Sequence, residues 1–291
     1  MVIPDSVYFI AEVSSNHNQS LARCLAFVDL AKSIGCSAIK FQLFRIEQLF
    51  SPEILAVSEQ HKRRKAWELP LAFIPDIATK CREKNIDFIC SPFDINAVSA
   101  LQPYVTSYKI SSYELMWDDL LIECAKTAKP IILSTGMSTM DEMQHAIEVL
   151  KTNKGLNPIL LHCTSSYPAP NVDANLAAIN TMRLETGCKV GLSDHTVQPG
   201  VLHRAIHRWG AEVIEFHLDI DGEGAEYAHG HCWLPDQIEA VIKQINIGLA
   251  ADGDGIKKPM PSELADRDWR ADPVDGLRPL QSVRSTFSQN R

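Results

Sequence analysis

The stretch Pro130–Lys151, PIILSTGMSTMDEMQHAIEVLK, contains a strand, a turn and a helix in immediate succession. Pro130–Ser134 is a short apolar run typical of a buried strand, and Met140–Lys151 is an amphipathic segment with helical periodicity. Ser138 or Thr139 can cap this helix, and two acidic residues follow in its first turn, where they favour the helix dipole. The stretch therefore predicts one strand–helix unit of an α/β protein.

The same pattern recurs along the chain, and the count of strands decides between two α/β folds. Seven further apolar runs predict strands: Val7–Val13, Ala38–Phe41, Asp87–Cys90, Ser107–Ile110, Pro158–His162, Lys189–Leu192 and Val213–His217. Further amphipathic segments are Leu21–Ile34, Leu71–Lys84, Asp118–Lys126, Gly200–Trp209 and Pro235–Leu249. An open doubly wound sheet is the alternative fold. In this sequence, however, the first strand is not followed by the Gly-x-Gly-x-x-Gly motif of the usual dinucleotide site. Eight strand–helix units are the number that closes a barrel, so we predict a (β/α)8 TIM barrel.

The composition changes near residue 250. Gly, Asp, Pro and Arg accumulate from Ala251 onward. We therefore predict a TIM-barrel domain over residues 1–250 and an irregular C-terminal extension over 251–291. Trp269 and Leu277 are apolar residues of the extension that would let it fold over a barrel mouth, its own or that of a neighbouring subunit.

Charge and composition exclude several classes of protein. The 291 residues carry a formal charge of -8, which disfavours nucleic acid as a partner. No run of about 18 apolar residues occurs, so we expect no transmembrane helix. Met1–Ser6 lack the basic and apolar segments of a secretory signal, and the eight scattered cysteines form no Cys-x-x-Cys pair. We therefore expect reduced core thiols rather than a disulfide framework, and a cytoplasmic protein.

Polar residues stand at the C-terminal end of nearly every predicted strand, where the active sites of parallel barrels form. A lone residue of this kind is more often a satisfied structural group, whereas a full ring of them indicates an enzyme. The ring consists of Glu12 and Ser14–His17, Lys40 and Gln42, Ser91 and Asp94, Lys109, Ser111, Ser112 and Glu114, Ser134 and Thr135, His162 and Thr164, Ser193–His195, and Glu215, His217 and Asp219.

Short motifs follow one another in a fixed order from about Phe9 to Leu249: Ile10–Glu12 with Asn16–Asn18, Ile39–Gln42, Ser91–Asp94, Tyr108–Ile110, Leu133–Met137, Leu161–Thr164, Tyr167–Pro168 and Gly191–His195. The ordered set resembles the sialic acid (N-acetylneuraminate) synthase family. The resemblance implies a barrel that condenses phosphoenolpyruvate with an N-acetylated amino-sugar aldehyde, giving a nonulosonic 2-keto-3-deoxy acid and phosphate. It also implies a divalent metal, with Mn²⁺ expected first and Mg²⁺ or Co²⁺ as alternatives.

This reaction needs cationic groups for the carboxylate and the phosphate of phosphoenolpyruvate. Lys40 and Lys109 stand at strand ends, and ammonium groups suit phosphate recognition. The structural alternative is a lysine that snorkels to the barrel rim. By resemblance, Lys109 aligns with the phosphate-side contacts together with Ser91, Ser112 and Ser134. We expect these residues and Lys40 to bind phosphoenolpyruvate.

Histidines are the candidate metal ligands. His217 aligns by resemblance with one ligand of the family, and the second comes from the loop before the last helix. His229 and His231 compete for that role, and we predict His231. Imidazole suits manganese or zinc, and two protein ligands leave positions open for water and the aldehyde. We interpret the neighbouring Cys232 as a buried thiol rather than as a zinc ligand.

Carboxylates complete the expected chemistry. Glu12 and Glu114 are expected to handle protons and contact the sugar, with pKa values tuned by the lysines and the metal, and Lys109 is the third catalytic residue. His17 faces either the sugar or a partner behind it. We expect the sugar half of the site to include His17, Gln42, Tyr167 and Asp194.

Two other functions stay open from the sequence. A keto-acid aldolase or lyase would use a Lys109 Schiff base and release no phosphate, and a non-catalytic sugar-binding barrel would not need the lysines, carboxylates and histidines together. We also expect a homodimer. Longer members of the family append a small antifreeze-like domain whose arginine reaches the sugar of the partner subunit. The extension would replace it here, with Arg270 or Arg278 approaching the sugar.

Overall fold

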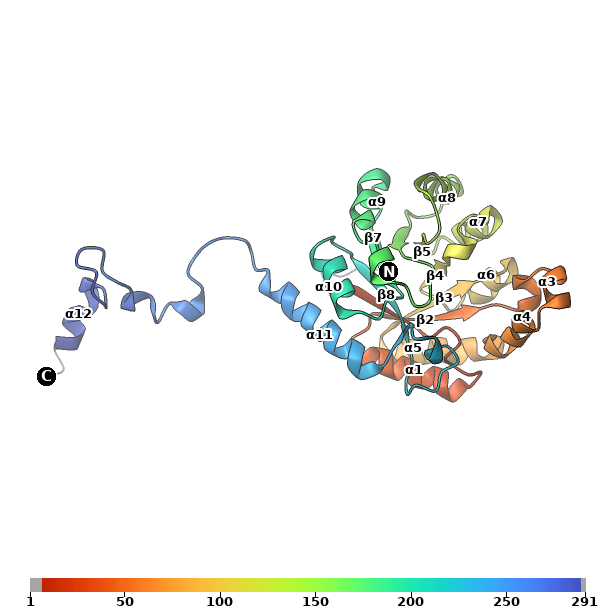
Figure 1. Cartoon of the computed structure of the whole chain (residues 1–291), viewed down its shortest axis with the longest axis horizontal. Helices are drawn as coiled ribbons and strands as arrows, with labels where there is room; N and C mark the ends of the chain where they lie inside the picture. The colour runs from red at the N-terminus through yellow and green to blue at the C-terminus, as the bar shows by residue number, and fades with distance from the viewer. Residues whose placement is uncertain (1–6, 289–291) are drawn as a thin grey trace. The chain divides into compact units, whose positions relative to one another are not determined.

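The computed structural model describes residues 7–288, and within them eight parallel strands close into a barrel. Each strand pairs with the next along the chain, and β8 pairs back with β1 (Figure 1). The predicted TIM barrel is confirmed. The strands are β1 (Tyr8–Glu12), β2 (Ala38–Leu43), β3 (Asp87–Pro92), β4 (Ser107–Ile110), β5 (Ile131–Ser134), β6 (Ile159–His162), β7 (Val190–Asp194) and β8 (Val213–Leu218).

The barrel interior is apolar in the N-terminal halves of the strands. One cluster of buried side chains there consists of Tyr8, Ile10, Ala38, Ile89, Ile132, Ile159, Leu161 and Val213. Gly191 in β7 leaves room for this packing, because a Cβ atom there would lie 2.1 Å from the carbonyl oxygen of Val213. Since apolar side chains fill this end, the polar residues of the opposite strand ends are left to form a cavity.

Helices surround the barrel (Figure 1). The cap of α8 falls on Thr139 rather than Ser138, since the Thr139 hydroxyl accepts from the Glu142 N–H at 3.3 Å and the Glu142 carboxylate accepts from the Thr139 N–H at 2.7 Å. This reciprocal pair satisfies two unpaired donors of the first turn. The main helices are α1 (Leu21–Ser33), α5 (Ile74–Lys84), α6 (Ile95–Leu101), α7 (Asp118–Lys126), α8 (Met140–Thr152), α9 (Ala178–Thr186), α10 (Pro199–His207) and α11 (Pro235–Ala251).

The connection from β2 to α5 holds short helices that the sequence pattern did not indicate. They are α2 (Ile46–Leu49), α3 (Pro52–Val57) and α4 (Glu59–Arg63), followed by two 3-10 turns, Arg64–Trp67 and Leu71–Phe73. The second turn occupies the start of the helix predicted at Leu71, and α5 itself begins at Ile74. Elements of four to six residues are too short to show helical periodicity, which explains why they were missed.

Contacts divide the chain into two compact units, Met1–Ile247 and Gly248–Arg291. The second unit holds α12 (Gln281–Ser288), although the sequence predicted an irregular extension. Trp269 and Phe287 pack edge to face with ring centroids 5.3 Å apart. The Arg284 guanidinium pairs with the Asp275 carboxylate. Packing of this extension over a barrel mouth stays a prediction.

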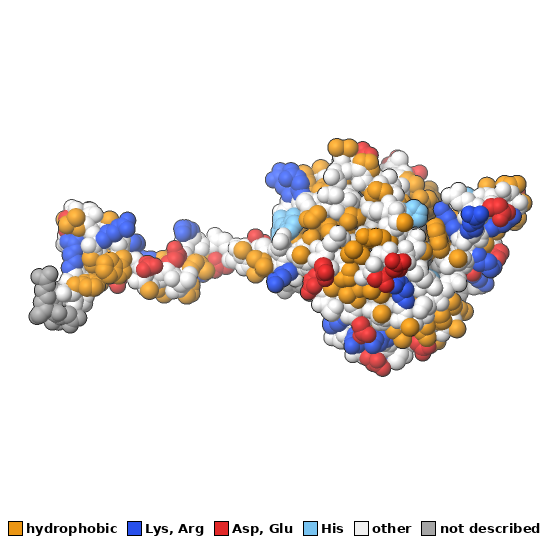
Figure 2. All heavy atoms as spheres, turned by 60° about the horizontal axis from the view of Figure 1, so that its bottom comes forward, with side chains coloured by type: hydrophobic (Ala, Val, Ile, Leu, Met, Phe, Trp, Pro, Cys, Tyr) orange, Lys and Arg blue, Asp and Glu red, His pale blue; other side chains and the backbone are white. Residues whose placement is uncertain are grey.

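The structure bears on the predictions about the cysteines, membrane helices and surface charge. All eight cysteines are buried free thiols, as predicted. No helix within residues 7–288 is long and apolar enough to cross a bilayer, while Met1–Ser6, on which the absence of a secretory signal rests, lie outside the described residues. On the face seen in Figure 2, basic and acidic side chains are interspersed.

Candidate active site

A cavity of about 640 Å³ opens at the C-terminal ends of the barrel strands. Its size lies within the range of small-molecule sites, ~300–1,000 Å³. Of the residues that the sequence assigned to the site, its lining includes Lys40, Gln42, Lys109, Ser112, Glu114, Ser134, Tyr167, His217 and His231. The structure therefore brings together side chains from five strand ends and the loops that follow them.

Two lysines share one carboxylate on one side of this cavity. The Lys40 ammonium lies 3.5 Å and the Lys109 ammonium 3.4 Å from Oε1 of Glu215, which the sequence had placed at a strand end without assigning a role. Lys40 also pairs with Glu12 at 2.6 Å, and Glu12 accepts a hydrogen bond from Gln42 at 2.7 Å. All four charged side chains are buried. The arrangement alternates carboxylates and ammonium groups along four strand ends.

Burial and charge shift the pKa values of this cluster in opposite directions. Burial lowers the pKa of Lys109, and the neighbouring Lys40 lowers it further. For Lys40, burial is outweighed by Glu12 and Glu215, so its pKa is raised. Burial would raise the pKa of Glu215, but the two ammonium groups lower it to about 2. Glu215 therefore stays ionised, and Lys40 stays protonated.

Hydroxyl groups lie beside the lysines. The Ser134 hydroxyl lines the cavity, is buried and has no hydrogen-bond partner among the described residues. Ser112 accepts from the Gly136 N–H at 2.9 Å and contacts the Cys163 thiol at 3.2 Å. Ser91 is buried without a partner as well, but it does not line the cavity. A buried hydroxyl without a partner is costly, and the Ser134 hydroxyl is free to donate to a ligand in the cavity.

Glu114 lies in the cavity wall after β4. Its carboxylate accepts a hydrogen bond from the Ser111 hydroxyl, and burial raises its pKa, partly offset by that bond and by Lys109. A carboxyl with a raised pKa retains its proton to higher pH and can serve as a general acid. Glu114 therefore lies in the cavity wall with its pKa raised by burial.

Four donor groups converge at β8 and the segment that follows it. One donor atom each from His217, Glu226, His231 and Cys232 lie within 4.8 Å of one another. The Glu226 carboxylate lies 3.2 Å from Nδ1 of His217 and 3.5 Å from Nε2 of His231. Nδ1 of His231 is buried and has no hydrogen-bond partner within residues 7–288. Imidazole, carboxylate and thiolate are ordinary ligands of divalent transition metals, so these residues fit a metal ion.

The electrostatics of this cluster favour a cation. Burial lowers the pKa of His217, but hydrogen bonds to Cys232 and Glu226 outweigh it and raise that pKa to about 10. For Glu226, burial is outweighed by both histidines, and its pKa falls well below the usual value. His217 is thus protonated, and this proton supplies the positive charge that the carboxylate of Glu226 favours. Release of this proton would accompany metal binding.

The structure separates the two competing histidines. The His231 ring is buried and lies 4.8 Å from the His217 ring, whereas His229 is exposed and lies 6.1 Å from His231. His231 reaches the cluster because the short strand β9 (Cys232–Trp233) pairs with β8, setting Cys232 beside His217. The geometry therefore favours His231.

Aromatic rings enclose the cluster from the cavity side. The Tyr167 ring lies 4.2 Å from the His195 ring and packs edge-on against His217 at 5.9 Å and His231 at 5.2 Å. Such rings limit water around the histidines and fix their planes. Tyr167 is 41% exposed, so one side of it stays available to a ligand.

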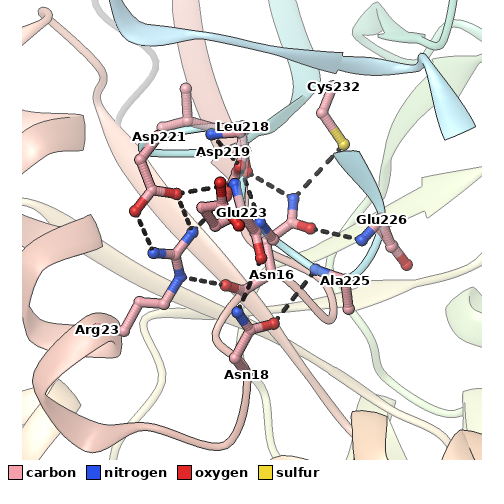
Figure 3. A network of polar contacts seen from close by, with 12 residues as sticks. Asn16, Asn18, Arg23, Leu218, Asp219, Asp221, Glu223, Ala225, Glu226 and Cys232 are labelled. Atoms are coloured by element: carbon pink, nitrogen blue, oxygen red, sulfur yellow. Dashed lines mark hydrogen bonds and ion pairs between the residues drawn. The ribbon is translucent and has the colours of Figure 1, made fainter. Parts of the chain in front are cut away.

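Hydrogen bonds from the loop after β1 fix the position of the loop after β8, which carries Glu226 (Figure 3). Asn16 accepts from the Glu226 N–H at 2.8 Å and donates to the Leu218 carbonyl at 3.0 Å and to the Cys232 sulfur at 3.5 Å. Arg23 pairs with Asp219 at 2.7 Å and with Asp221 at 2.8 Å. These contacts link Glu226 and Cys232 to the barrel through segments about 200 residues apart in the sequence.

Besides Ser91, three residues assigned from the sequence do not line the cavity. Asp194 accepts from the Thr196 hydroxyl at 2.6 Å, from two backbone N–H groups and from Trp233 Nε1 at 3.3 Å, so it shapes the loop after β7 instead of facing a sugar. His17 is buried below the mouth, and its Nδ1 accepts from a backbone N–H. Glu12 lies behind Lys40 and Gln42.

Sequence reasoning missed Glu226 and the wall built by the short helices. Glu226 stands in a loop, where no periodicity marks it, although it precedes the two histidines by three and five residues. The wall includes Phe50, His61, Arg64 and Trp67. The Arg64 guanidinium lies over the Phe50 ring at 5.6 Å and over the Trp67 ring at 5.3 Å.

The chain is similar to known proteins in both sequence and structure. A model of the NeuB family matches residues 27–257. The chain is 33% identical over 267 residues to the N,N'-diacetyllegionaminic acid synthase of Campylobacter jejuni, covering 87% of this chain and 80% of that one. It is 31% identical over 267 residues to a pseudaminic acid synthase of the same species, covering 86% and 76%. The crystal structure of an N-acetylneuraminic acid synthetase from Leptospira borgpetersenii aligns with a TM-score of 0.79 and 30% identity over 90% of each chain.

Proposed function

Because this chain belongs to the NeuB family, we propose that it condenses phosphoenolpyruvate with an N-acetylated amino-sugar aldehyde. The products are a sialic-acid-like 2-keto-3-deoxy acid and phosphate. The observation that carries the proposal is the pair of buried ammonium groups on Glu215, which share a cavity with the cluster of His217, Glu226 and His231. The ammonium groups suit the carboxylate and the phosphate of phosphoenolpyruvate, and the second cluster suits a metal that polarises an aldehyde.

The lysine side of the cavity would hold phosphoenolpyruvate. Lys40 and Lys109 face its carboxylate and phosphate, while the Ser134 and Ser112 hydroxyls take the remaining oxygens. Glu12 does not touch substrate in this scheme. It holds the Lys40 ammonium in place and orients the Gln42 amide, which lines the cavity.

Glu114 and the sugar wall would serve the aldehyde. C3 of phosphoenolpyruvate forms a bond to the aldehyde carbon, and the aldehyde oxygen takes the proton that Glu114 holds at its raised pKa. Water adds at C2 and returns one proton to Glu114. The bond between C2 and the bridging oxygen then breaks, phosphate leaves with that oxygen and the second water proton, and the water oxygen becomes the keto oxygen. Gln42 and Tyr167 are the polar groups of the lining that would contact the sugar.

His217, His231 and Glu226 would hold the divalent metal, for which we propose Mn²⁺, with Mg²⁺ or Co²⁺ as alternatives. When bound, the metal supplies Lewis acidity toward the aldehyde oxygen. The aromatic ring of Tyr167 limits the access of water to that side. A homodimer and a cytoplasmic location stay predictions.

Phosphate release tests the reaction. The purified protein is incubated with Mn²⁺, phosphoenolpyruvate and a panel of N-acetylated amino sugars, and inorganic phosphate is measured. We expect phosphate release that depends on both the sugar and the metal and that stops with a chelator. Release without any sugar, or none with every sugar tested, contradicts the proposal.

A Lys109 Schiff base is the second candidate, because burial and Lys40 lower the pKa of Lys109 and so favour its neutral amine. A keto-acid aldolase on this barrel would form an adduct with pyruvate that borohydride traps. We expect no trapped mass on Lys109, since Glu215 pairs with this ammonium at 3.4 Å. A stable pyruvyl adduct at Lys109 would favour the aldolase.

A further inference from the structure

We propose that the Cys232 thiolate is a direct metal ligand, so that the site holds its metal through nitrogen, oxygen and sulfur. The inference deepens the proposed function and rests on it only for the presence of a metal in this cluster. The Cys232 donor atom lies within 4.8 Å of those of His217, Glu226 and His231. This is the spacing of donors that a single ion can gather with small movements.

The fold places the sulfur by two independent devices. Strand pairing between β8 and β9 sets Cys232 opposite His217, which aims both side chains to the same side. The Asn16 amide then donates to the Cys232 sulfur at 3.5 Å, while the same side chain accepts from the Glu226 N–H at 2.8 Å. An N–H donor of this kind orients a ligand from behind and is the usual support of a metal-bound group.

The position of Cys232 suits a ligand that does not block the substrate. His217, Glu226 and His231 line the cavity, whereas Cys232 does not. The thiolate therefore meets the ion from the buried side, which leaves the cavity side for water or an aldehyde oxygen. Another free cysteine, Cys163, lines the cavity and contacts the Ser112 hydroxyl at 3.2 Å, but it is no member of the cluster.

A sulfur donor changes which ions the site prefers. Thiolates are soft ligands that favour zinc and its neighbours, whereas a set of imidazole and carboxylate alone suits manganese and magnesium better. The site should therefore bind Co²⁺ and Zn²⁺ more tightly relative to Mn²⁺ than a variant without the thiol. Which ion serves in the cell also depends on availability.

Cobalt spectroscopy tests the ligand directly. Metal-free full-length protein is titrated with Co²⁺ in the absence of substrate, and bound cobalt is counted by equilibrium dialysis. We expect a sulfur-to-cobalt charge-transfer band in the near ultraviolet for the natural protein and for Cys163→Ser. Cys232→Ser should bind cobalt but lose the band. A band of unchanged intensity in Cys232→Ser, or cobalt bound to the natural protein without the band, overturns the proposal.

X-ray absorption keeps the test decisive if Cys232→Ser does not fold. The zinc-loaded natural protein should show one sulfur scatterer at about 2.3 Å beside nitrogen or oxygen scatterers at about 2.0–2.1 Å. A shell without sulfur overturns the thiolate ligand. Phosphate release is measured separately, so a protein that makes phosphate without a metal–sulfur signal refutes only this inference. A sulfur signal without phosphate release refutes only the proposed reaction.

Discussion

Glu215 stands between two buried ammonium groups, and its removal should be costly. Glu215→Gln leaves Lys40 and Lys109 without their shared counter-charge, and breaking a buried pair typically costs about 3–5 kcal/mol. We expect a loss of this order in the free energy of unfolding, measured by urea denaturation at pH 7. Glu212→Gln is the control, since Glu212 pairs with Lys189 at the surface and should lose less than about 1 kcal/mol.

The same carboxylate gives the stability a pH dependence. The folded protein lowers the pKa of Glu215 from 4.5 to about 2, so the unfolded chain binds this proton first as the pH falls. The contribution of Glu215 is complete above about pH 4.5 and is lost as the pH falls toward 2. The difference in the free energy of unfolding between the natural protein and Glu215→Gln should therefore shrink from pH 7 through pH 4.5 to pH 3. A constant difference between them would contradict this assignment.

We expect that replacing Lys109 weakens the binding of phosphoenolpyruvate. Removing an ammonium from a desolvated anion contact costs about 2–5 kcal/mol, which corresponds to roughly 30-fold or more in affinity. Lys109→Met should raise the KM for phosphoenolpyruvate by at least that factor and change the KM of the sugar far less. Lys126→Met is the control, because Lys126 is exposed and pairs with Glu123 on its own helix. An unchanged phosphoenolpyruvate affinity in folded Lys109→Met would refute the role.

The loop from Asp219 to Glu226 is the element on which the metal cluster depends. Gly224 packs so closely that a Cβ atom would lie 2.4 Å from Oδ1 of Asp219 and 2.5 Å from Oδ1 of Asn16. Gly224→Ala must therefore push apart the two residues that hold the loop and shift Glu226. Because the supports of a metal ligand typically contribute 10–100-fold to affinity, we expect a loss of about that size in metal affinity.

Isothermal titration with Mn²⁺ or Co²⁺ measures this effect. The matched control is Gly200→Ala in α10, where an added Cβ meets nothing within 4 Å and the backbone is helical. Alanine favours a helix over glycine by up to about 1 kcal/mol, so Gly200→Ala should leave metal affinity unchanged and not lower stability. Equal metal affinity in the two variants would show that the loop does not position Glu226.

At the scale of the whole molecule, the C-terminal extension forms a compact unit of its own. Trp269 packs on Phe287, and Arg270 and Arg278 lie in a unit with its own internal contacts. We predict that this unit packs over a barrel mouth and that one of these arginines approaches the sugar. Truncation after Ala251, the last residue of α11, leaves the barrel helix whole. The KM of the sugar should rise and kcat fall, while the KM of phosphoenolpyruvate stays within about threefold.

The oligomeric state of the shortened protein is measured together with its kinetics. Sedimentation velocity of the shortened and the full chain shows whether the extension also holds a dimer together. A shortened protein that folds with the same KM and kcat for the sugar would show that the extension only packs. The variants Arg270→Ala and Arg278→Ala in the full chain test each arginine separately.

Local pattern was enough to predict every strand of the barrel and most of its helices. Runs such as Pro130–Ser134 are apolar because both faces of a parallel strand are buried, and the following amphipathic segments must cover them. The same rule predicted that Lys40, Lys109, Ser134 and His217 would face one end, because parallel strands present their C-terminal ends together. These features depend on residues close in the sequence.

Contacts between distant segments could not be predicted in this way. Glu226 meets His217 and His231 only because Asn16, about 210 residues earlier, holds its backbone, and Cys232 faces the cluster only through the pairing of β9 with β8. Likewise, Asp194 has the residue type of a ligand contact, but its carboxylate is filled by its own loop and by Trp233. The local sequence determined that this chain closes a barrel with a polar mouth. Tertiary packing alone decided which of the polar groups remain free to bind, because the partners that occupy the others come from remote parts of the chain.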